Sequence, residues 1–278
     1  MNAFSLSLRF LSILVLSGLL AVGIEAQAQH TRSAEQTIDL QPDGKVELSA
    51  VAGSVRVSTW DRPAVGMALQ IKGSSAAAVD DIRVQVEGDD SHVKIRTSNA
   101  DPDGVGFLDL IGFGSTGGPA TNYTLRVPKA ASLRISTKGG TVEVAGLGGD
   151  VTVEGMSTSV HVRDIGGRVI AGTFSGPLRA ENVRGELIFG TFSGNLYLRA
   201  TSLPAKSQIG SFSGNAEVVM PADAAFNLKT ETTWGGKITS DFALPDSSAQ
   251  DDGTIPIGGG GPTIAFESFS GDLTLRAE

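Results

Sequence analysis

The side chains that could carry out acid–base or metal chemistry are few in this sequence. Its 278 residues include no cysteine and three histidines, which are His30, His92 and His161. A zinc site needs three or four nitrogen, sulfur or oxygen ligands gathered around one ion. These histidines are far apart in the sequence and there is no thiolate to join them. We therefore predict no zinc site.

Two acidic clusters beside glycine are candidate cation sites. They are Asp101-x-Asp103-Gly104 and Asp251-Asp252-Gly253. Aspartate and glycine also form turns, and turn formation explains both clusters better. Nonapeptide repeats that bind calcium carry aspartate at one fixed place in each unit, whereas Asp150 and Asp164 fall at different places here. We therefore predict no metal and no cofactor.

Three serines, Ser175, Ser193 and Ser213, lie in a repeated Phe-Ser-Gly motif. A catalytic serine needs a positioned base and an oxyanion site, and no histidine follows His161. We predict that the serines form a ladder of corners, that no residue is catalytic and that the chain is not an enzyme. A polysaccharide-processing enzyme on a β-helix stays as the alternative function, because distant residues can converge in a fold.

These residues are positioned by a nine-residue repeat, Φ-x-Φ-x-x-Φ-x-Gly-x, in which Φ is apolar. The units begin at Leu133, Val142, Val151, Val160, Val169, Leu178, Leu187 and Leu196. Two apolar residues at a spacing of two lie on one face of a strand, and glycine allows the chain to turn. A unit this short buries its apolar face only when neighbouring units stack.

Pairs of units resemble each other at a spacing of eighteen, because Thr-Phe-Ser-Gly at 173–176 recurs at 191–194. Related Ser-Phe-Ser-Gly corners occur at 211–214 and 268–271. We predict an all-β fold, a parallel β-helix or β-roll-like solenoid with two short strands in each eighteen-residue coil and no helix after the signal peptide. In this prediction Phe174, Phe192 and Phe212 form a stacked ladder inside the coil, and Trp234 takes the same place in a later coil.

The first 28 residues have the features of a secretory signal peptide. Arg9 precedes an apolar run at 10–24, and Ala26-Gln27-Ala28 is typical of a cleavage site. We predict an exported protein, periplasmic or extracellular after cleavage near Ala28. A flexible leader at 29–35 is expected to precede a single β-solenoid domain at 36–278. Loop excursions are expected at 101–120 and 245–262, and a hairpin turn at 88–91.

The charge of the chain limits its partners. The formal net charge is −8, and affinity for nucleic acid rests on clustered lysine and arginine, so we expect no nucleic-acid partner. On one wall of the predicted coil, Arg163, Glu181 and Arg199 take the same outward position in successive coils. Their alternating signs predict weak cross-strand pairs on a solvated surface.

Several structural motifs resemble one known family. They are Tyr123-Thr-Leu-Arg-Val-Pro128, Leu133-x-Ile135-x-Thr137-x-Gly139-Gly140, the Phe-Ser-Gly corners and Val218-Val-Met-Pro221. Together they resemble the bacterial putative-adhesin family of β-strand-repeat, or toast-rack, envelope domains over residues 46–275. The chain departs from the pattern at Lys138, Thr158 and Thr201 and in its two long loops. The resemblance implies a non-catalytic, exported interaction module, in adhesion, scaffolding or envelope sensing.

A flat, partly apolar strip is expected on the other wall of the coil. Its outward positions in the later coils are Ile170, Gly172, Ile188, Gly190, Gln208 and Gly210. Two interpretations are open. In the one that we favour, a loop or the N-terminal strands lie over the strip; in the other, it docks a partner. The partner would be an envelope protein, a glycan or a second copy of the chain.

The loop at 105–113 is apolar, although loops usually carry polar residues. Its large apolar side chains are Phe107, Leu108, Leu110, Ile111 and Phe113. We expect this loop to cap an open end of the coil stack, where it would hide apolar core and unpaired strand edges. Contact with a membrane or a partner is the alternative that we do not favour.

Overall fold

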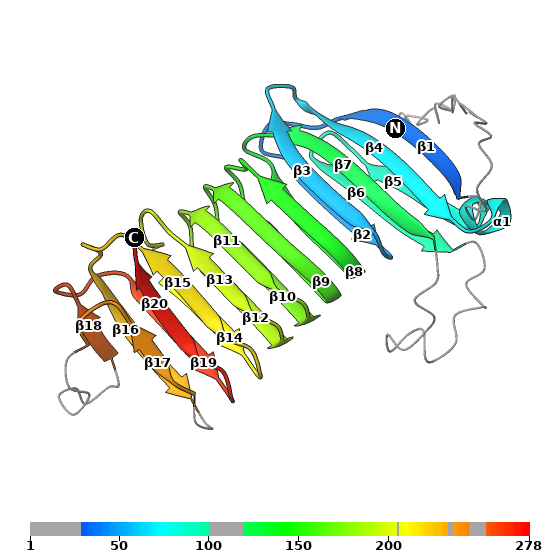
Figure 1. Cartoon of the computed structure of the whole chain (residues 1–278). Helices are drawn as coiled ribbons and strands as arrows, with labels where there is room; N and C mark the ends of the chain where they lie inside the picture. Colours follow the sequence, from blue (N-terminus) through cyan, green and yellow to red (C-terminus); the bar gives the residue numbers. More distant parts are fainter. Residues whose placement is uncertain (1–28, 100–118, 205, 233–235, 245–253) are drawn as a thin grey trace, which may run out of the picture.

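The computed structural model describes residues 29–99, 119–204, 206–232, 236–244 and 254–278. This part of the chain is all-β apart from one short helix, and its twenty strands belong to one open sheet (Figure 1). The strands stand side by side in an elongated array, with β1 and β4 near one end and β16 and β18 at the other. Within the described ranges, no helix has the length and apolar character needed to cross a membrane.

The first half of the chain contains β1 (His30–Asp39), β2 (Lys45–Ala50), β3 (Ser54–Trp60), β4 (Ala64–Gly73), α1 (Ala76–Asp80), β5 (Ile82–Gly88), β6 (His92–Asn99), β7 (Ala120–Pro128) and β8 (Ser132–Ala145). The second half contains β9 (Val151–Ile165), β10 (Val169–Ser175), β11 (Leu178–Val183), β12 (Leu187–Ser193), β13 (Leu196–Arg199), β14 (Lys206–Ser211), β15 (Ala216–Met220), β16 (Phe226–Thr232), β17 (Ile238–Ser240), β18 (Thr254–Ile257), β19 (Thr263–Ser268) and β20 (Leu273–Ala277).

Two sets of parallel strands carry the repeat, and the long strands β8 and β9 belong to both. In the first set, called wall 1, the order is β6, β2, β8, β9, β10, β12, β14, β19 and β16. In the second set, called wall 2, the order is β3, β8, β9, β11, β13, β15, β20 and β17. In the centre of wall 1 the register advances by eighteen residues, because Val151 pairs with Val169 and Val169 with Leu187.

The inward side chains of the two walls form one hydrophobic core. In β10, Val169 and Ala171 point inward and are buried, whereas Ile170 and Gly172 point outward and are half-buried. This alternation is the geometry of an extended strand. All eight aliphatic residues that begin the nine-residue units are buried, as their spacing predicts.

Glycine is required at the corners between units. Gly176 has a φ of 145°, and a Cβ built on it would lie 2.2 Å from the Thr158 carbonyl oxygen. A Cβ on Gly194 would lie 2.1 Å from the Gly176 carbonyl oxygen, and one on Gly214 would lie 1.9 Å from that of Gly194. Consecutive corners therefore stack too closely for any side chain, which explains the glycine in the unit.

The order of strands in space departs from their order in the sequence near the C-terminus. β19 lies between β14 and β16, and β20 lies between β15 and β17 (Figure 1). The last repeat of the chain therefore lies between two earlier repeats and does not form the end of the array. The corner sequence explains the position of this repeat. Ser-Phe-Ser-Gly occurs at both 268–271 and 211–214, and the two corners stack on each other.

At the other end of the array, β1, β4 and β7 pair antiparallel and join wall 2 through β3. β1 pairs with β4 along its whole length, from His30 opposite Gly73 to Asp39 opposite Ala64. The prediction of a flexible leader at 29–35 is therefore wrong for residues 30–35, because strand pairing holds them. The hairpin predicted at 88–91 is confirmed, since β5 and β6 pair antiparallel on either side of it.

The prediction of no helix after the signal peptide is also wrong. α1 is a single short helix, and the Ser75 side-chain oxygen caps it by accepting a hydrogen bond from the Ala78 N–H at 3.2 Å. Alanine is the best helix former and serine a preferred N-cap. Val79 anchors the helix in the core, with 3% of its surface exposed. A helix this short leaves no periodic pattern in the sequence.

Some predicted features lie outside the described residues. They are the signal segment at 1–28, the apolar loop at 105–113 and Trp234. The excursion at 245–262 is described only from residue 254 onward. There β18 pairs antiparallel with β16, and three glycines at 258–260 with positive φ turn the chain back.

Candidate interaction face

A flat surface of wall 1 carries a row of exposed aromatic rings, called here the Phe stack. Its members Phe174, Phe192, Phe212 and Phe269 are 60%, 44%, 43% and 37% exposed. The prediction that the phenylalanine ladder lies inside the coil is therefore wrong. The rings do stack, with successive centroids 4.8, 4.6 and 4.6 Å apart and planes within 5° of parallel. Each inner ring covers the faces of its neighbours, so the stack presents ring edges to solvent.

Strand alternation places the Phe stack on the outside. In β10 the outward residues are Ile170, Gly172 and Phe174, at a spacing of two. In wall 2 the residue at the same place in the unit is Ile165, and it is buried. The reason is Asp164, whose φ of 55° interrupts the extended backbone and reverses the alternation before Ile165.

The fifth residue of most units distinguishes the two walls and could have located the Phe stack from the sequence. In wall 2 this place holds Gly146, Asp164 and Asn182, with φ values of 75°, 55° and 53°. Glycine, aspartate and asparagine are the residues that best tolerate a left-handed backbone. In wall 1 the same place holds Thr137, Thr173 and Thr191; the exceptions are Gly155 in wall 1 and Ala200 in wall 2. A β-branched residue stays extended, so the alternation continues and the phenylalanine points outward.

Beside the Phe stack runs a row of glycines that the fold does not require, called here the glycine trough. Gly172, Gly190 and Gly210 lie opposite one another in β10, β12 and β14, and none has a positive φ. A Cβ built on Gly190 would meet no atom within 4 Å, and the nearest atoms to one on Gly172 or Gly210 would be 3.9 and 3.8 Å away. The two distances are ordinary van der Waals contacts, so a Cβ would fit at all three positions.

The glycine trough has mostly apolar sides and acidic ends. The Phe stack forms one side, and Ile170, Ile188 and Gln208 form the other, two residues earlier in each strand. The next strand at each end carries a glutamate in the glycine row, namely Glu154 in β9 and Glu267 in β19. The face therefore consists of an apolar centre bounded by charge.

The six residues predicted for the interaction face lie together on this surface, and all six are half-buried. Sequence reasoning missed the Phe stack, which completes the same surface. At Gly190 the described part of the chain leaves the trough uncovered, because no described atom comes within 4 Å of a Cβ built there. Coverage of Ile170 and Ile188 by another element stays a prediction.

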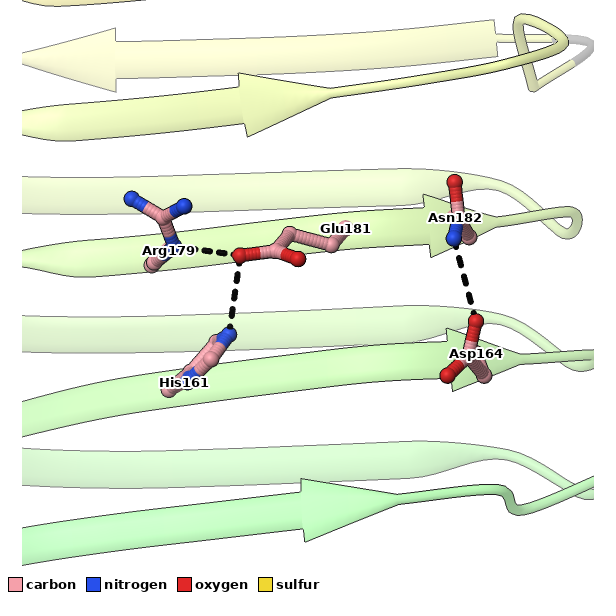
Figure 2. A network of polar contacts seen from close by, with 5 residues as sticks. All are labelled: His161, Asp164, Arg179, Glu181 and Asn182. Atoms are coloured by element: carbon pink, nitrogen blue, oxygen red, sulfur yellow. Dashed lines mark hydrogen bonds and ion pairs between the residues drawn. The ribbon is translucent and has the colours of Figure 1, made fainter.

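Wall 2 presents a charged surface instead. Figure 2 shows its centre, where the Glu181 carboxylate meets Arg179 of the same strand and His161 of the neighbouring strand, with His161 Nε2 3.2 Å from Glu181 Oε1. Arg163 and Arg199, the partners predicted for Glu181, make no ion pair with it in the described structure. Glu181 and Arg199 therefore pair with other residues than expected, and Arg163 has no ion pair among the described residues.

The charged network stabilises a surface and shows no arrangement for catalysis. Partial burial raises the pKa of Glu181, but the hydrogen bond and charge of Arg179, together with the charge of His161, outweigh it and hold that pKa below its ordinary value. At the strand end, the Asn182 amide donates to the Asp164 carboxylate at 3.1 Å (Figure 2). Among the described residues, the polar contact of His161 is with Glu181 and not with a serine or threonine nucleophile.

Metal ligands do not gather in the described part of the chain. Within the described ranges, no group of three or more histidine, aspartate or glutamate side chains could hold an ion. The two acidic clusters that the sequence suggested, at 101–104 and 251–253, lie outside those ranges.

Known proteins resemble the chain in structure and not in sequence. No family model matches it, and no curated protein matches its sequence. A putative cell adhesion protein from Clostridium sporogenes is 10% identical, with a TM-score of 0.40 over 88% of this chain and 100% of that one. A putative adhesin from Bacteroides fragilis is 13% identical, with a TM-score of 0.41 over 92% of this chain and 100% of that one.

The chain is similar to putative adhesins. It is also similar to a putative lipid binding protein from Parabacteroides distasonis, at 13% identity and a TM-score of 0.43 over 87% of this chain and 96% of that one. At such low identities and TM-scores these similarities indicate nothing about individual residues, so the face described above rests on this chain's own geometry.

Proposed function

We propose that the chain is an exported, non-catalytic interaction module, and that it binds another envelope protein through the Phe stack and the glycine trough. The observation that carries the proposal is the glycine trough itself. Glycine inside a strand costs about 0.5–1 kcal/mol relative to alanine. The corner glycines are needed for close stacking, but Gly172, Gly190 and Gly210 are not. Interior strand glycines without a structural need are typical of places where a partner approaches closely.

The chemistry of the face favours a protein surface as the partner. Exposed apolar patches of this kind mark interaction sites, and an apolar centre with a charged rim is typical of protein interfaces. A sugar ring would stack on the face of an aromatic ring. In the Phe stack the inner ring faces are already covered by neighbouring rings at 4.6–4.8 Å. Ring edges and bare backbone instead fit the apolar side chains of another protein.

The proposal includes the architecture that presents the face. Walls 1 and 2 are taken as two sides of one β-solenoid, in which each eighteen-residue coil contributes one strand to each wall. The eighteen-residue register and the shared core support this arrangement. Stacked repeats of this kind give long flat surfaces. Export, with cleavage near Ala28 and a periplasmic or extracellular location, completes the proposal.

Site-specific photo-crosslinking in the producing bacterium tests the binding face. A photoreactive phenylalanine analogue replaces Phe192, and in a matched control it replaces Tyr197, a half-buried aromatic residue on wall 2. We expect irradiation to give discrete adducts with another envelope protein from position 192 and none from position 197. Filling the trough with Gly190→Val should remove the adducts while the protein remains folded.

Three results would count against this function. Equal adducts from positions 192 and 197 would show that the face is not selective. An adduct with twice the mass of the chain would mean self-association instead of binding to another protein. Unchanged adducts in Gly190→Val would show that the trough takes no part in the contact.

A further inference from the structure

The outer surface formed by β1, β4, β7 and β3 is hollowed into a groove. Two adjoining hollows of about 460 and 340 Å³ lie there, and both are lined by Glu35, Ala68 and Thr124. The three residues stand opposite one another in β1, β4 and β7. The side chains of Ala68 and Thr124 are small, which leaves space above these strands, and strands of a sheet twist relative to one another. The strands that form the groove lie at the end of the array that contains β1, whereas β10, β12 and β14 of wall 1 lie further along it (Figure 1).

The groove is positively charged on a protein that is negatively charged overall. Three cations, Arg56, Lys72 and Arg126, line it against one carboxylate, that of Glu35. Arg56 is paired with Glu143, with Nε 3.3 Å from Oε2. In the described structure neither Lys72 nor Arg126 has an ion-pair partner. The formal charge of the chain is −8, so this local excess of positive charge is a property of the groove.

The two unpaired cations lie far apart along the groove. Arg126 stands opposite position 66 of β4, and Lys72 stands six residues further along the same strand. At about 3.4 Å per residue, the two positions are about 20 Å apart. An isolated phosphate or carboxylate would reach one of them only. A ligand that satisfies both is an extended polyanion.

Trp60 is held in place at one end of the groove. Its indole Nε1–H donates to the Ala64 carbonyl oxygen at 2.7 Å, and the Arg62 guanidinium carbon lies 5.1 Å from the ring centroid. A Cβ built on Gly66 would come within 2.6 Å of the ring, so glycine is what allows the indole to lie against the sheet. Indole rings are common contact surfaces for the apolar faces of ligands that are otherwise polar.

Neutral hydrogen-bonding groups fill the space between the cations. The amides of Gln70 and Asn122 and the hydroxyl groups of Ser33 and Thr124 line the groove. The Asn122 Oδ1 accepts from the Ser54 N–H and hydroxyl at 3.0 and 2.8 Å. Asn122 lines the groove, and its amide nitrogen makes no hydrogen bond within the described ranges, so two N–H donors are left for a ligand.

We propose that this groove binds an anionic polysaccharide, with Lys72 and Arg126 contacting acidic groups and the amide and hydroxyl side chains contacting sugar hydroxyls. An acidic peptide fits less well. The backbone groups of β4 are used by β1 and β7, and those of β7 by β4 and β3. An extended peptide therefore finds no free strand edge on β4 or β7, the two strands in the middle of the groove. Side-chain donors, spaced cations and an indole are instead suited to a sugar chain with repeated charge.

Calorimetric titration of the purified protein tests this proposal with two probes, oligogalacturonate for carboxylates and dextran sulfate for sulfates. Methyl-esterified oligogalacturonate and plain dextran are the neutral counterparts. We expect at least one anionic saccharide to bind, more weakly as salt rises, and both neutral counterparts to fail. Lys72→Gln and Arg126→Gln should each weaken binding on the order of tenfold or more, the loss of one charged hydrogen bond.

Arg163→Gln is the matched control, because Arg163 is an exposed arginine of wall 2 outside the groove. It removes the same charge and should leave the affinity unchanged. An equal loss in Arg163→Gln would show that only overall charge matters, and would overturn the proposal. The proposal would be overturned if neither anionic saccharide bound. It would also be overturned if poly-glutamate or the esterified saccharide bound as tightly as the anionic saccharides. The titrations with the anionic and neutral saccharides use the wild-type protein, so they test the proposal even if a variant fails to fold.

Discussion

Two glycines four residues apart should respond in opposite ways to added side chains. Gly190 lies in the middle of β12 on the glycine trough, and Gly194 forms the corner after that strand. A Cβ at position 190 would meet no described atom within 4 Å. At position 194 it would lie 2.1 Å from the Gly176 carbonyl oxygen. We therefore predict that Gly190→Val is tolerated and that Gly194→Ala is not.

The size of each effect follows from the geometry. Replacing an interior strand glycine removes a penalty of about 0.5–1 kcal/mol, and valine suits an extended strand. Gly190→Val should therefore stabilise the protein by about 0.5–1 kcal/mol. At Gly194 the neighbouring corner must move by roughly 1 Å, which costs about 1–3 kcal/mol in a packed structure. Lost pairing between the corners adds about 1 kcal/mol for each broken hydrogen bond.

Urea unfolding followed by circular dichroism measures both changes as free energies of unfolding. The two variants should differ by about 3 kcal/mol or more, with Gly190→Val the more stable. Destabilisation of Gly190→Val by more than about 1 kcal/mol would show that the fold requires this glycine and would remove the main support for the trough. A neutral Gly194→Ala would refute the steric explanation of the corners.

Three further predictions concern the core, the charged wall and export. Phe189→Ala should lower the free energy of unfolding by about 3–5 kcal/mol, because that side chain is 2% exposed. Phe192→Ala on the same strand should lower it by about 1–2 kcal/mol, because that side chain is 44% exposed. Equal losses in chemical denaturation would contradict the placement of the Phe stack. The pKa of Glu181 is lowered from its ordinary value of 4.5, so its contribution to stability is complete above about pH 4.5 and is lost as the pH falls through the folded pKa. Acidification from pH 7 to about pH 3 should therefore destabilise the wild type more than Glu181→Gln, and identical pH profiles would exclude this role. Mass spectrometry of the protein exported by a bacterial host should find a chain that begins near Gln29, just before β1, and an intact Met1 would contradict export with cleavage.

The sequence by itself determined the repeat and the side chains that form its core. Apolar residues at a spacing of two identify the buried face of a strand, because alternation is a local property of an extended backbone. For this reason Val169 and Ala171 could be assigned to the core, and Ile170 and Gly172 to the outside, without a structure. The corner glycines were visible for a similar local reason, since the chain must turn after each short strand.

The phenylalanines show how far local information reaches. Their place in the nine-residue unit is the same as that of the buried Ile165 and Val183, so a single consensus for both walls put them inside. Asp164 and Asn182 reverse the alternation in wall 2 through a left-handed backbone, whereas Thr173 precedes Phe174 in wall 1. This difference was present in the sequence. It predicts which aromatic or aliphatic side chains point outward only when the units of wall 1 and wall 2 are compared separately.

Only the tertiary structure decided which distant segments lie together. The insertion of β19 between β14 and β16 depends on the match between corners 57 residues apart, Phe212 and Phe269. The groove joins β3 to β7, β4 and β1, and the antiparallel pairing of these last three strands has no counterpart in the repeat. Strand pairing between distant segments is chosen by the free energy of the whole array, because each strand can satisfy its backbone hydrogen bonds with many partners. Local spacing therefore specifies the face on which a side chain lies, and the packed array specifies its neighbours.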